Sequence, residues 1–491
     1  MMTRSIFFLA LLLSYSASAW AQSSQPNIIL MMSDDQGWGD TGYNGHPYLK
    51  TPHLDEMAKK GITFTRFYSA NAMCSPTRAS VYLGRHPYRT GITFAMKGKL
   101  EPEEITLTSV LKKEGYTTGH FGKWHMGTLS KKKPDQRRWG AFEEDPERYY
   151  CPPWERDVDV SFVTESKVPT WDPMVDPGPV TPAESKGASP SSGNIEDPGL
   201  NPGESGEDTT GQYYGNEYFT GPDEIETENL DGDDSRVIMD RVIPFIEQAV
   251  QKSQPFLAVV WFHTPHSPVV GGPDHKAMYA DRPEHEQHYY ASLTAMDEQI
   301  GRLRAKLKTL EVSDNTMLWF CSDNGPARQG SPRHVGRTNG LSGFKLSIQE
   351  GGIRVPGLLV WPGKYPNHQT ITTPCVTTDY FPTILAALNI PLPDDRPYDG
   401  INLWPLIDNP TWTRSKPIGF IHNGKVWMDY KYKIISKNDD AFRLYDIIAD
   451  SAETTNLAKK LPKVYEHMIA KFESWHSGVI ADLERVENIA D

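Results

Sequence analysis

The sequence contains little cysteine, with four residues in a chain of 491. These four are widely spaced, at positions 74, 151, 321 and 375. So few thiols in a chain of this size do not form the disulfide framework that small exported domains use in place of a core. The sequence leaves pairing of Cys151 with Cys375 open. The chain is long enough to bury a large apolar core in one main domain, with a smaller unit beside it.

Positive charge is also in deficit, because 50 Lys and Arg residues face 63 Asp and Glu residues and the net charge is -13. This balance argues against general binding of nucleic acids, which requires basic groups that neutralise backbone phosphates. It also imposes a condition on any anionic substrate. Cations would have to be gathered locally at the site that binds it.

Long apolar runs are absent, and a membrane-spanning helix needs about 20 apolar residues, so we expect no stable membrane insertion. The N-terminal run from Ile6 to Leu13 is much shorter, follows Arg4 and leads to small residues that end at Ala21. This order is typical of a secretory signal peptide, with a buried N-terminal helix as the alternative. We predict a signal peptide over residues 1–21 and export to the periplasm or the medium.

Continuous apolar runs predict buried parallel strands, because strands that are covered on both faces do not alternate. Four strand-like runs cover residues 26–32, 116–123, 256–262 and 316–320. Helical patterns lie between them, at 51–61, 109–114, 234–250 and 290–310. Strands that alternate with helices predict an α/β fold with a doubly wound, mostly parallel sheet flanked by helices.

The composition changes at two places along the chain. From about residue 151 to residue 233, Pro, Gly, Ser, Glu and Asp dominate, which indicates a long irregular insertion within a catalytic domain over 22–408. Short strand-like segments and a final helical pattern follow, at 426–436, 443–446 and 460–481. We interpret residues 409–491 as a small C-terminal α+β subdomain.

Polar residues follow each strand-like run directly. The four runs continue into Ser33-Asp34-Asp35, Lys123-Trp124-His125, His263 to Pro268 and Ser322 to Gly325. Ligands of open parallel sheets bind beyond the carboxyl ends of the strands. We therefore expect these four ends to converge on one crevice.

Two of these strand ends are rich in side-chain oxygens. Asp34, Asp35, Asp323 and Asn324 offer hard oxygen ligands, which suit calcium or magnesium. Taken singly, an Asp-Asp or Asp-Asn-Gly sequence more often forms a turn with Asx hydrogen bonds. Together at two strand ends, these residues favour a metal site.

A distinctive motif lies near these residues in the sequence. Residues 71–85 read NAMCSPTRASVYLGR, and Thr90-Gly91 follows. This segment resembles the C-x-P-x-R signature of the type I sulfatases, whose cysteine is oxidised after translation to formylglycine (3-oxoalanine). An isolated motif of this kind is also compatible with a buried structural cysteine before a turn.

The resemblance extends over nearly the whole chain after the predicted signal peptide. The matching segments are 27–40, 51–61, 122–127, 265–268, 322–325 and 343–356. It implies the alkaline-phosphatase-like α/β fold: a large mixed, mostly parallel sheet flanked by helices, with a small C-terminal α+β subdomain.

The resemblance also implies a cofactor and a modified nucleophile. Calcium, in preference to magnesium, would be bound by Asp34, Asp35, Cys74, Asp323 and Asn324. Formylglycine made from Cys74 would attack sulfur, since its hydrate is a geminal diol. A sulfatase-maturation enzyme, such as a formylglycine-generating enzyme, would be a partner during biosynthesis.

Five further catalytic residues follow from the same resemblance. Arg78 would stabilise the hydrated aldehyde, while Lys123 and Lys345 would hold sulfate oxygens. His125 would take a proton during sulfate elimination, and His266 would donate one to the leaving oxygen. These roles match the needs of sulfate-ester cleavage, which are a nucleophile, neutralised sulfonyl oxygens and a protonated leaving group.

Other polar residues are candidates for supporting roles. His263, three residues before His266, is a candidate for a position behind the reacting groups. Arg333, His334 and Arg337 lie between Asn324 and Lys345, and we interpret these three as candidate substrate-binding residues on the rim.

We therefore predict a sulfuric ester hydrolase that acts on a sulfated polysaccharide or oligosaccharide. One alternative is a phosphodiester or phosphonate monoester hydrolase of the same superfamily. Another is a catalytically silent glycan-binding homologue. The sequence argues against this alternative, because every expected catalytic position is occupied.

Overall fold

The computed structural model describes residues 25–95, 97–132, 145–178, 210–327, 335–409, 411–438 and 440–490. The predicted signal peptide lies outside these ranges. No helix within them combines the length and the apolar character needed to cross a membrane.

The core of the protein is a ten-stranded sheet with the strand order β12-β2-β11-β9-β1-β8-β4-β5-β6-β7. Its five central strands, from β9 to β5, run parallel to one another. β11 is antiparallel to its neighbours β9 and β2, and β6 is antiparallel to β5 and β7. The prediction of a mixed, mostly parallel sheet is confirmed.

The strands of this sheet have the following bounds: β1 Asn27–Ser33, β2 Ile62–Phe64, β4 Thr117–Lys123, β5 Val160–Thr164, β6 Phe219–Gly221, β7 Glu224–Ile225, β8 Phe256–Trp261, β9 Thr316–Ser322, β11 Gly357–Val360 and β12 Gln369–Ile371. A separate three-stranded sheet comprises β3 (Phe67–Tyr68), β10 (Arg354–Val355) and β13 (Cys375–Val376).

Helices cover both faces of the main sheet. The helices of the described residues, including those outside these two layers, are α1 Pro52–Lys60, α2 Cys74–Leu83, α3 Leu107–Lys113, α5 Asp234–Gln251, α6 Pro273–Ala277, α7 Glu284–Thr309, α8 Glu350–Ile353, α9 Tyr380–Ala387, α10 Trp404–Asp408 and α11 Pro462–Ala490. Short 3-10 turns occur at Pro87–Thr90, Pro153–Glu155, Ser313–Asn315 and Thr377–Asp379.

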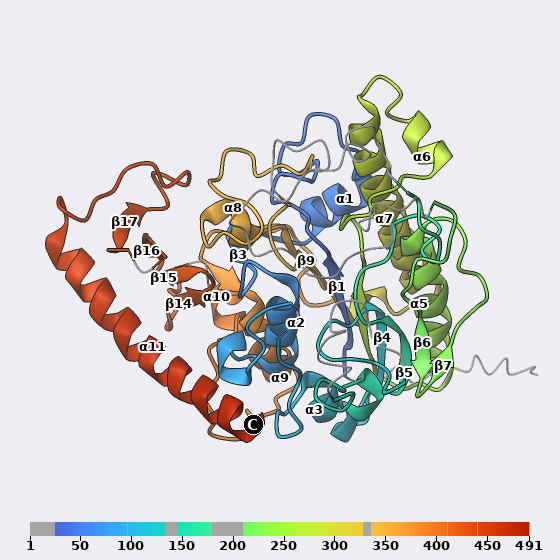
Figure 1. Ribbon diagram of the computed structural model, residues 1–491, viewed down its shortest axis with the longest axis horizontal. Helices are drawn as coiled ribbons and strands as arrows, with labels where there is room; N and C mark the ends of the chain where they lie inside the picture. Colours follow the sequence, from blue (N-terminus) through green and yellow to red (C-terminus); the bar gives the residue numbers. More distant parts are fainter. Residues whose placement is uncertain are drawn as a thin grey trace, which may run out of the picture.

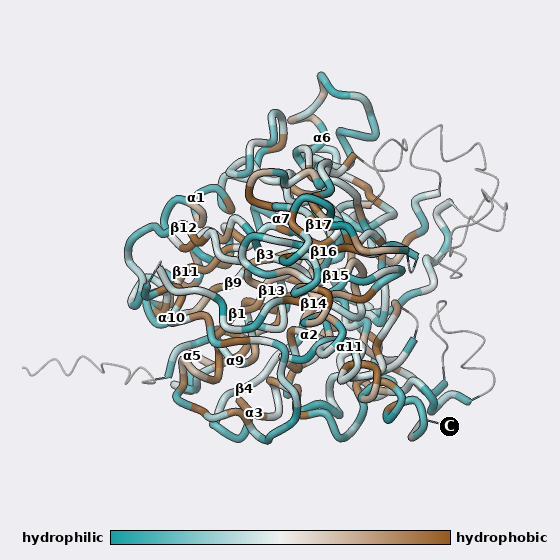
Figure 2. The backbone as a smooth tube through the Cα atoms, turned by 90° about the vertical axis from the view of Figure 1, so that its left-hand side faces the viewer, coloured by the Kyte–Doolittle hydropathy of each residue, from teal (hydrophilic) through white to brown (hydrophobic). Residues whose placement is uncertain are grey.

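The central strand β1 shows why two helical layers form. Ile28, Leu30 and Met32 belong to an apolar cluster with α2, α3, α9 and α10. Ile29 and Met31 belong to a second cluster with α1, α5 and α7. Successive strand residues point to opposite faces, so a continuous apolar strand needs a helical cover on each side. Figure 1 shows α2 and α9 on one side of β1 and α5 and α7 on the other. Figure 2 shows that hydrophobic residues are concentrated inside the molecule.

A four-stranded antiparallel sheet follows the main domain, with the order β14-β15-β16-β17. These strands are Ile418–Ile421, Gly424–Met428, Tyr432–Lys437 and Arg443–Asp446. The long helix α11 packs on one face through a cluster that includes Trp427, Ile434 and Phe472, and it runs along the edge of the molecule in Figure 1. The prediction of a small C-terminal α+β subdomain is confirmed.

The region expected to be a long irregular insertion contains regular structure. Within its described parts, β5 pairs in parallel with β4 and so extends the main sheet, and β6 and β7 continue that edge. The described segments otherwise consist mainly of turns and loops. The thiols of Cys151 and Cys375 are both free and buried, so these two residues do not form a disulfide.

Candidate active site

The register of two neighbouring strands brings the acidic residues together. β1 and β9 pair Ser33 with Ser322, so Asp34 and Asp323 leave the sheet side by side. The backbone N–H of Asp35 donates to Asp323 Oδ1 over 3.1 Å. Asn324 Nδ2 donates to Asp35 Oδ1 over 2.7 Å. The predicted convergence of these two strand ends is therefore present.

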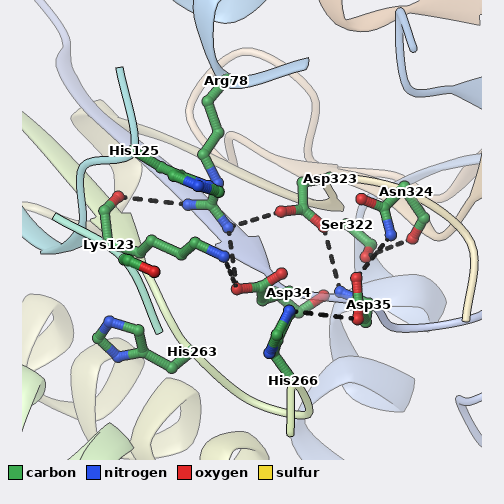
Figure 3. Close-up of polar contacts among 12 residues, drawn as sticks. Asp34, Asp35, Arg78, Lys123, His125, His263, His266, Ser322, Asp323 and Asn324 are labelled. Atoms are coloured by element: carbon green, nitrogen blue, oxygen red, sulfur yellow. Dashed lines mark hydrogen bonds and ion pairs between the residues drawn. The ribbon is translucent and has the colours of Figure 1, made fainter. Parts of the chain in front are cut away.

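Three cations contact the carboxylates, and Figure 3 shows two of them, Arg78 and Lys123, beside Asp34. Arg78 Nη2 is 2.6 Å from Asp323 Oδ2 and 3.6 Å from Asp34 Oδ2. Lys123 Nζ is 2.7 Å from Asp34 Oδ2, and Lys345 Nζ is 2.8 Å from Asp35 Oδ1. Apart from Lys345, which is slightly exposed, these side chains are buried. Positive charge is thus concentrated at one point of an acidic protein.

The helix α2 positions Cys74 and Arg78. Cys74 is its first residue, and Arg78 lies one turn further along the same face. Burial alone would lower the pKa of Arg78, but Asp323, Asp34 and Cys74 together raise it. Cys74 also contributes to the raised pKa of Lys345, where burial is again opposed by Asp35. The cysteine therefore lies within electrostatic reach of two of the three cations.

The acidic residues respond differently to this environment. Burial would raise the pKa of Asp34, but the charges of Lys123, Arg78 and Lys345 outweigh it and hold the pKa well below its usual range. Burial and the neighbouring Asp34 raise the pKa of Asp323 to about 7. Asp34 is therefore ionised. Simultaneous ionisation of every carboxylate at the site is unfavourable unless more positive charge is present.

Two histidines lie beside this group. His125 follows β4 with a left-handed backbone (φ 58°), and its N–H donates to the carbonyl of Glu165. His266 Nε2 is 3.7 Å from Asp35 Oδ2, and its ring Nδ1 bonds to the carbonyl oxygen of Ser267. Burial and the charge of Lys345 lower the pKa of His266 well below its usual range, so the ring is neutral in the free site.

His263 is held by polar contacts of its own. Its ring is fully buried between Asp234, whose Oδ2 is 2.8 Å from Nδ1, and Thr164, whose Oγ1 is 2.7 Å from Nε2. The backbone carbonyl of His263 accepts from the N–H of His266 over 2.7 Å. His263 therefore anchors the turn that carries His266.

Several side chains at the site offer donor atoms for a metal ion. Asp34 Oδ1 and Asn324 Oδ1 are buried without a hydrogen-bond partner, which is unfavourable for a polar oxygen unless another group coordinates it. One ligand atom from each of Asp34, Asp35 and His266 lies within 4.8 Å of the others. This cluster could bind a metal ion, and its oxygens suit a hard cation.

Comparison with known proteins identifies the family. A model of the Sulfatase family matches residues 26–390. Arylsulfatase G from Mus musculus is 33% identical over 405 residues, which cover 79% of this chain and 70% of the relative. The chain belongs to the sulfatase family. It is therefore a sulfuric ester hydrolase.

Other similar proteins agree with this sulfatase assignment. N-acetylgalactosamine-6-sulfatase from Homo sapiens is 30% identical, covering 78% of the sulfatase described here and 66% of the relative. A crystal structure of Ps i-CgsB in complex with k-i-k-neocarrahexaose has a TM-score of 0.73 at 25% identity and covers 92% of both chains. PsFucS1 sulfatase from Pseudoalteromonas sp., with a TM-score of 0.74 at 22% identity over 94% of this chain and 92% of its own, shares the fold.

The structure of this sulfatase brings most of the predicted site residues to one place. Gathered there are Asp34, Asp35, Cys74, Arg78, Lys123, His125, His266, Asp323, Asn324 and Lys345. His266, expected as a proton donor, also belongs to the metal-capable group. Asp323, one of the expected metal ligands, also contacts Arg78 and the backbone N–H of Asp35.

Of the three residues predicted to bind substrate at the rim, the structure describes one. Arg333 and His334 lie outside the described residues. Arg337 is described, and its backbone N–H donates to Asp40 Oδ1 over 2.9 Å while its carbonyl accepts from Gly39. Arg337 therefore lies against the loop that follows Asp35.

Sequence reasoning missed supporting residues of the sulfatase site. Ser75 Oγ donates to the carbonyl of His125 over 2.6 Å and so links α2 to the end of β4. Asp234, at the start of α5, contacts His263. The position of Ser75 next to Cys74 was a usable signal, whereas nothing local in the sequence connects Asp234 with position 263.

Proposed function

We propose that this sulfatase removes sulfate from a sulfated polysaccharide or oligosaccharide, with a formylglycine made from Cys74 and a bound calcium ion. The observation that carries the proposal is the position of Cys74. It begins α2 within electrostatic reach of Arg78 and Lys345, which themselves contact the carboxylates of Asp323 and Asp35.

Four oxygen-bearing residues would hold the cation: Asp34, Asp35, Asp323 and Asn324, together with the modified residue 74. When bound, calcium supplies positive charge that orients an anionic ester and withdraws electron density from it. The unpartnered oxygens of Asp34 and Asn324 support this assignment. The raised pKa of Asp323 supports it too, since added positive charge would favour its ionised form.

One hydroxyl oxygen of hydrated formylglycine would bond to sulfur as the bond from sulfur to the alcohol oxygen breaks. Loss of the proton from the second hydroxyl would then re-form the aldehyde and break the bond between its carbon and the sulfate oxygen. The residues around position 74 have separate tasks. Lys123 and Lys345 approach the carboxylates of Asp34 and Asp35 and would neutralise the sulfate oxygens placed between them. Arg78 is fixed by Asp323 and would stabilise the oxygens of residue 74.

The two histidines would move protons. His266 is neutral in the free site, and the negative charge of a bound sulfate ester would raise its pKa. The imidazole would then carry a proton to the leaving alcohol oxygen. His125, on the other side of the group, would accept the proton that is released when sulfate is eliminated.

The relatives support a carbohydrate substrate. One curated relative is an N-acetylgalactosamine-6-sulfatase, and one similar structure holds an oligosaccharide, k-i-k-neocarrahexaose. The N-terminal sequence supports export to the periplasm or medium, where such polymers occur. N-terminal sequencing of the protein recovered from those fractions would test export, and an intact residue 1 would contradict it.

The function is tested by measuring free sulfate after incubation with a panel of sulfated oligosaccharides, a small aryl sulfate and matched phosphate diesters. We expect release from at least one oligosaccharide and none from Cys74→Ala. Release from the aryl sulfate alone would contradict the carbohydrate substrate. A large preference for phosphate diesters would favour the phosphonate hydrolase alternative, and unchanged release by Cys74→Ala would contradict the nucleophile. Peptide mass spectrometry of residue 74 would establish its modification.

A further inference from the structure

A lysine of the C-terminal subdomain is fully buried where the subdomain meets the catalytic domain. Lys433 lies on β16, and its Nζ is 3.0 Å from Glu350 Oε1 and 2.9 Å from Glu453 Oε1. None of the three side chains is accessible to solvent. A buried ammonium group is strongly unfavourable unless it is paired, and here two carboxylates share it.

These contacts lead directly to the loop that carries Lys345, which we call the Lys345 loop (residues 342–350). At one end, the backbone N–H of Glu350 donates to Glu453 Oε2 over 2.9 Å. At the other end, Ser342 Oγ donates to the carbonyl of Ala452 over 2.5 Å. The C-terminal subdomain therefore holds both ends of the Lys345 loop.

The middle of the Lys345 loop is held in an unfavourable conformation. Leu346 has a left-handed backbone (φ 71°), which is strained for a side chain of this size. Its N–H donates to the carbonyl of Ala72, and the N–H of Lys345 donates to the carbonyl of Pro326. Such a conformation persists only where the surrounding structure imposes it, and it directs Lys345 towards Asp35.

A second set of contacts reaches the loop that follows Asp35. Glu350 Oε2 accepts from the hydroxyl of Tyr68 over 2.8 Å and lies 3.7 Å from Arg354 Nη1. The guanidinium of Arg354 lies over the ring of Trp38, 4.8 Å from its centroid. Trp38 follows Asp35 by three residues, so Glu350 connects to both loops that meet at the Lys345–Asp35 pair.

We propose that Lys433 is a positioning residue for Lys345, acting from the neighbouring subdomain through Glu350 and Glu453. The inference rests on the proposed role of Lys345 in sulfate binding. Without the ammonium of Lys433, two carboxylates would face each other in a buried site, where like charges disfavour joint ionisation. Their separation or protonation would release an end of the Lys345 loop and shift Lys345 away from the sulfate.

A double-mutant cycle tests this coupling. Lys345→Ala is expected to lower kcat/KM by itself. Lys433→Met in the otherwise natural enzyme should lower kcat/KM by about 10- to 100-fold, because misplacement by about 1 Å has effects of that size. In the Lys345→Ala background, Lys433→Met should change kcat/KM by less than about twofold, as expected when one residue acts through the other.

Lys431→Met is the matched control. Lys431 precedes β16, is half exposed and pairs with Asp446 at 3.4 Å inside the subdomain, so its loss should leave kcat/KM unchanged. Lys433→Met should still unfold cooperatively, because other contacts join the two units, including Arg414 with Asp379 at 2.7 Å. If Lys433→Met does not fold, Glu453→Gln enters the same cycle, since it weakens the hold on Glu350 while leaving the Lys433–Glu350 pair.

The outcomes separate the inference from the proposed function. An equal loss from Lys433→Met in both backgrounds would overturn the positioning role while leaving the function of Lys345 intact. No effect of Lys345→Ala would instead contradict the proposed role of Lys345. Partial recovery of kcat/KM in Lys433→Met with Glu453→Gln would support the inference further, because the double variant carries one fewer unpaired carboxylate.

Discussion

Arg78 and Asp323 are 245 positions apart in the chain, yet Arg78 Nη2 and Asp323 Oδ2 meet at 2.6 Å with neither side chain accessible to solvent. Asp34 lies 3.6 Å from the same nitrogen. One guanidinium therefore compensates two buried carboxylates that come from different strands. These three charged residues of the candidate active site therefore also belong to the buried core.

Loss of this guanidinium should destabilise the protein. We expect Arg78→Met to lower the free energy of unfolding by about 3–5 kcal/mol, because a buried charge loses its partner. Urea denaturation of chelator-treated protein would measure the change. Arg302→Met is the control, since Arg302 pairs with Asp240 at the surface and should contribute no more than about 1 kcal/mol. Equal effects of the two substitutions would contradict the role of Arg78.

Removal of divalent cations should reduce both activity and thermal stability. A ligand that binds only the folded state raises the melting temperature as its concentration rises. We expect EGTA to abolish sulfate release and lower the melting temperature, and calcium to restore both. Asp34→Asn should remove the calcium-dependent rise, whereas Asp240→Asn, a surface change, should retain it. Restoration by zinc but not by calcium or magnesium would contradict a site made of hard oxygen ligands.

Asp399 should contribute stability that is lost in acid. It contacts Arg89 at 3.0 Å, the N–H of His86 and Trp475 Nε1. Burial would raise the pKa of Asp399, but Arg89 and His86 outweigh it and lower the pKa. The folded state thus binds the proton more weakly than the unfolded state, whose Asp pKa is about 3.9. The stabilisation is present above that pH and is lost as the pH falls through the lower, folded-state pKa.

The substitution Asp399→Asn tests this pH dependence. It keeps the shape of the side chain and removes the charge. We expect a lower free energy of unfolding at pH 7, by about 2–4 kcal/mol, and a smaller difference from the natural protein as the pH falls. A constant difference at all pH values, measured by urea denaturation, would show that the carboxylate charge has no part in the effect.

Gly84 should be required at the end of α2. Its backbone is left-handed (φ 66°), and a Cβ atom there would lie 2.8 Å from Phe381 Cβ. We expect Gly84→Ala to lower the free energy of unfolding by more than about 1 kcal/mol, from backbone strain and this contact together. Gly115→Ala is a matched control, because Gly115 is also left-handed (φ 87°) but a Cβ there would meet nothing within 4 Å. Thermal unfolding of both variants would separate the two contributions.

Much of the fold could be predicted because its signals are local. The apolar runs that became β1, β8 and β9 are continuous, and each is bounded by polar residues. β5 was missed because Val160–Thr164 is short, mixes polar with apolar residues and lies in an acidic, proline-rich context. α7 begins at Glu284 instead of residue 290, since its first turn is polar and its apolar periodicity starts later.

The candidate site likewise has one part that the sequence predicts and another part that it does not. Residues that lie at strand ends or within contiguous motifs, such as Asp34, Lys123 and Asp323, were predictable from local order. The contacts of Lys433 with Glu350 and of Glu350 with Glu453 span 83 and 103 positions. Each of these three charges alone is typical of an exposed surface residue. Their burial depends on how the subdomain docks, which no local pattern encodes.

The pairing of Ser33 with Ser322 in the central strands also makes the site sensitive to changes that alter no reactive group. Deletion of a single residue inside β1 would turn its alternate side chains to the opposite layer and draw Asp34 back along the strand while Asp323 stayed in place. Length variation during the divergence of such chains should therefore accumulate in the loops and spare the interior of β1 and β9.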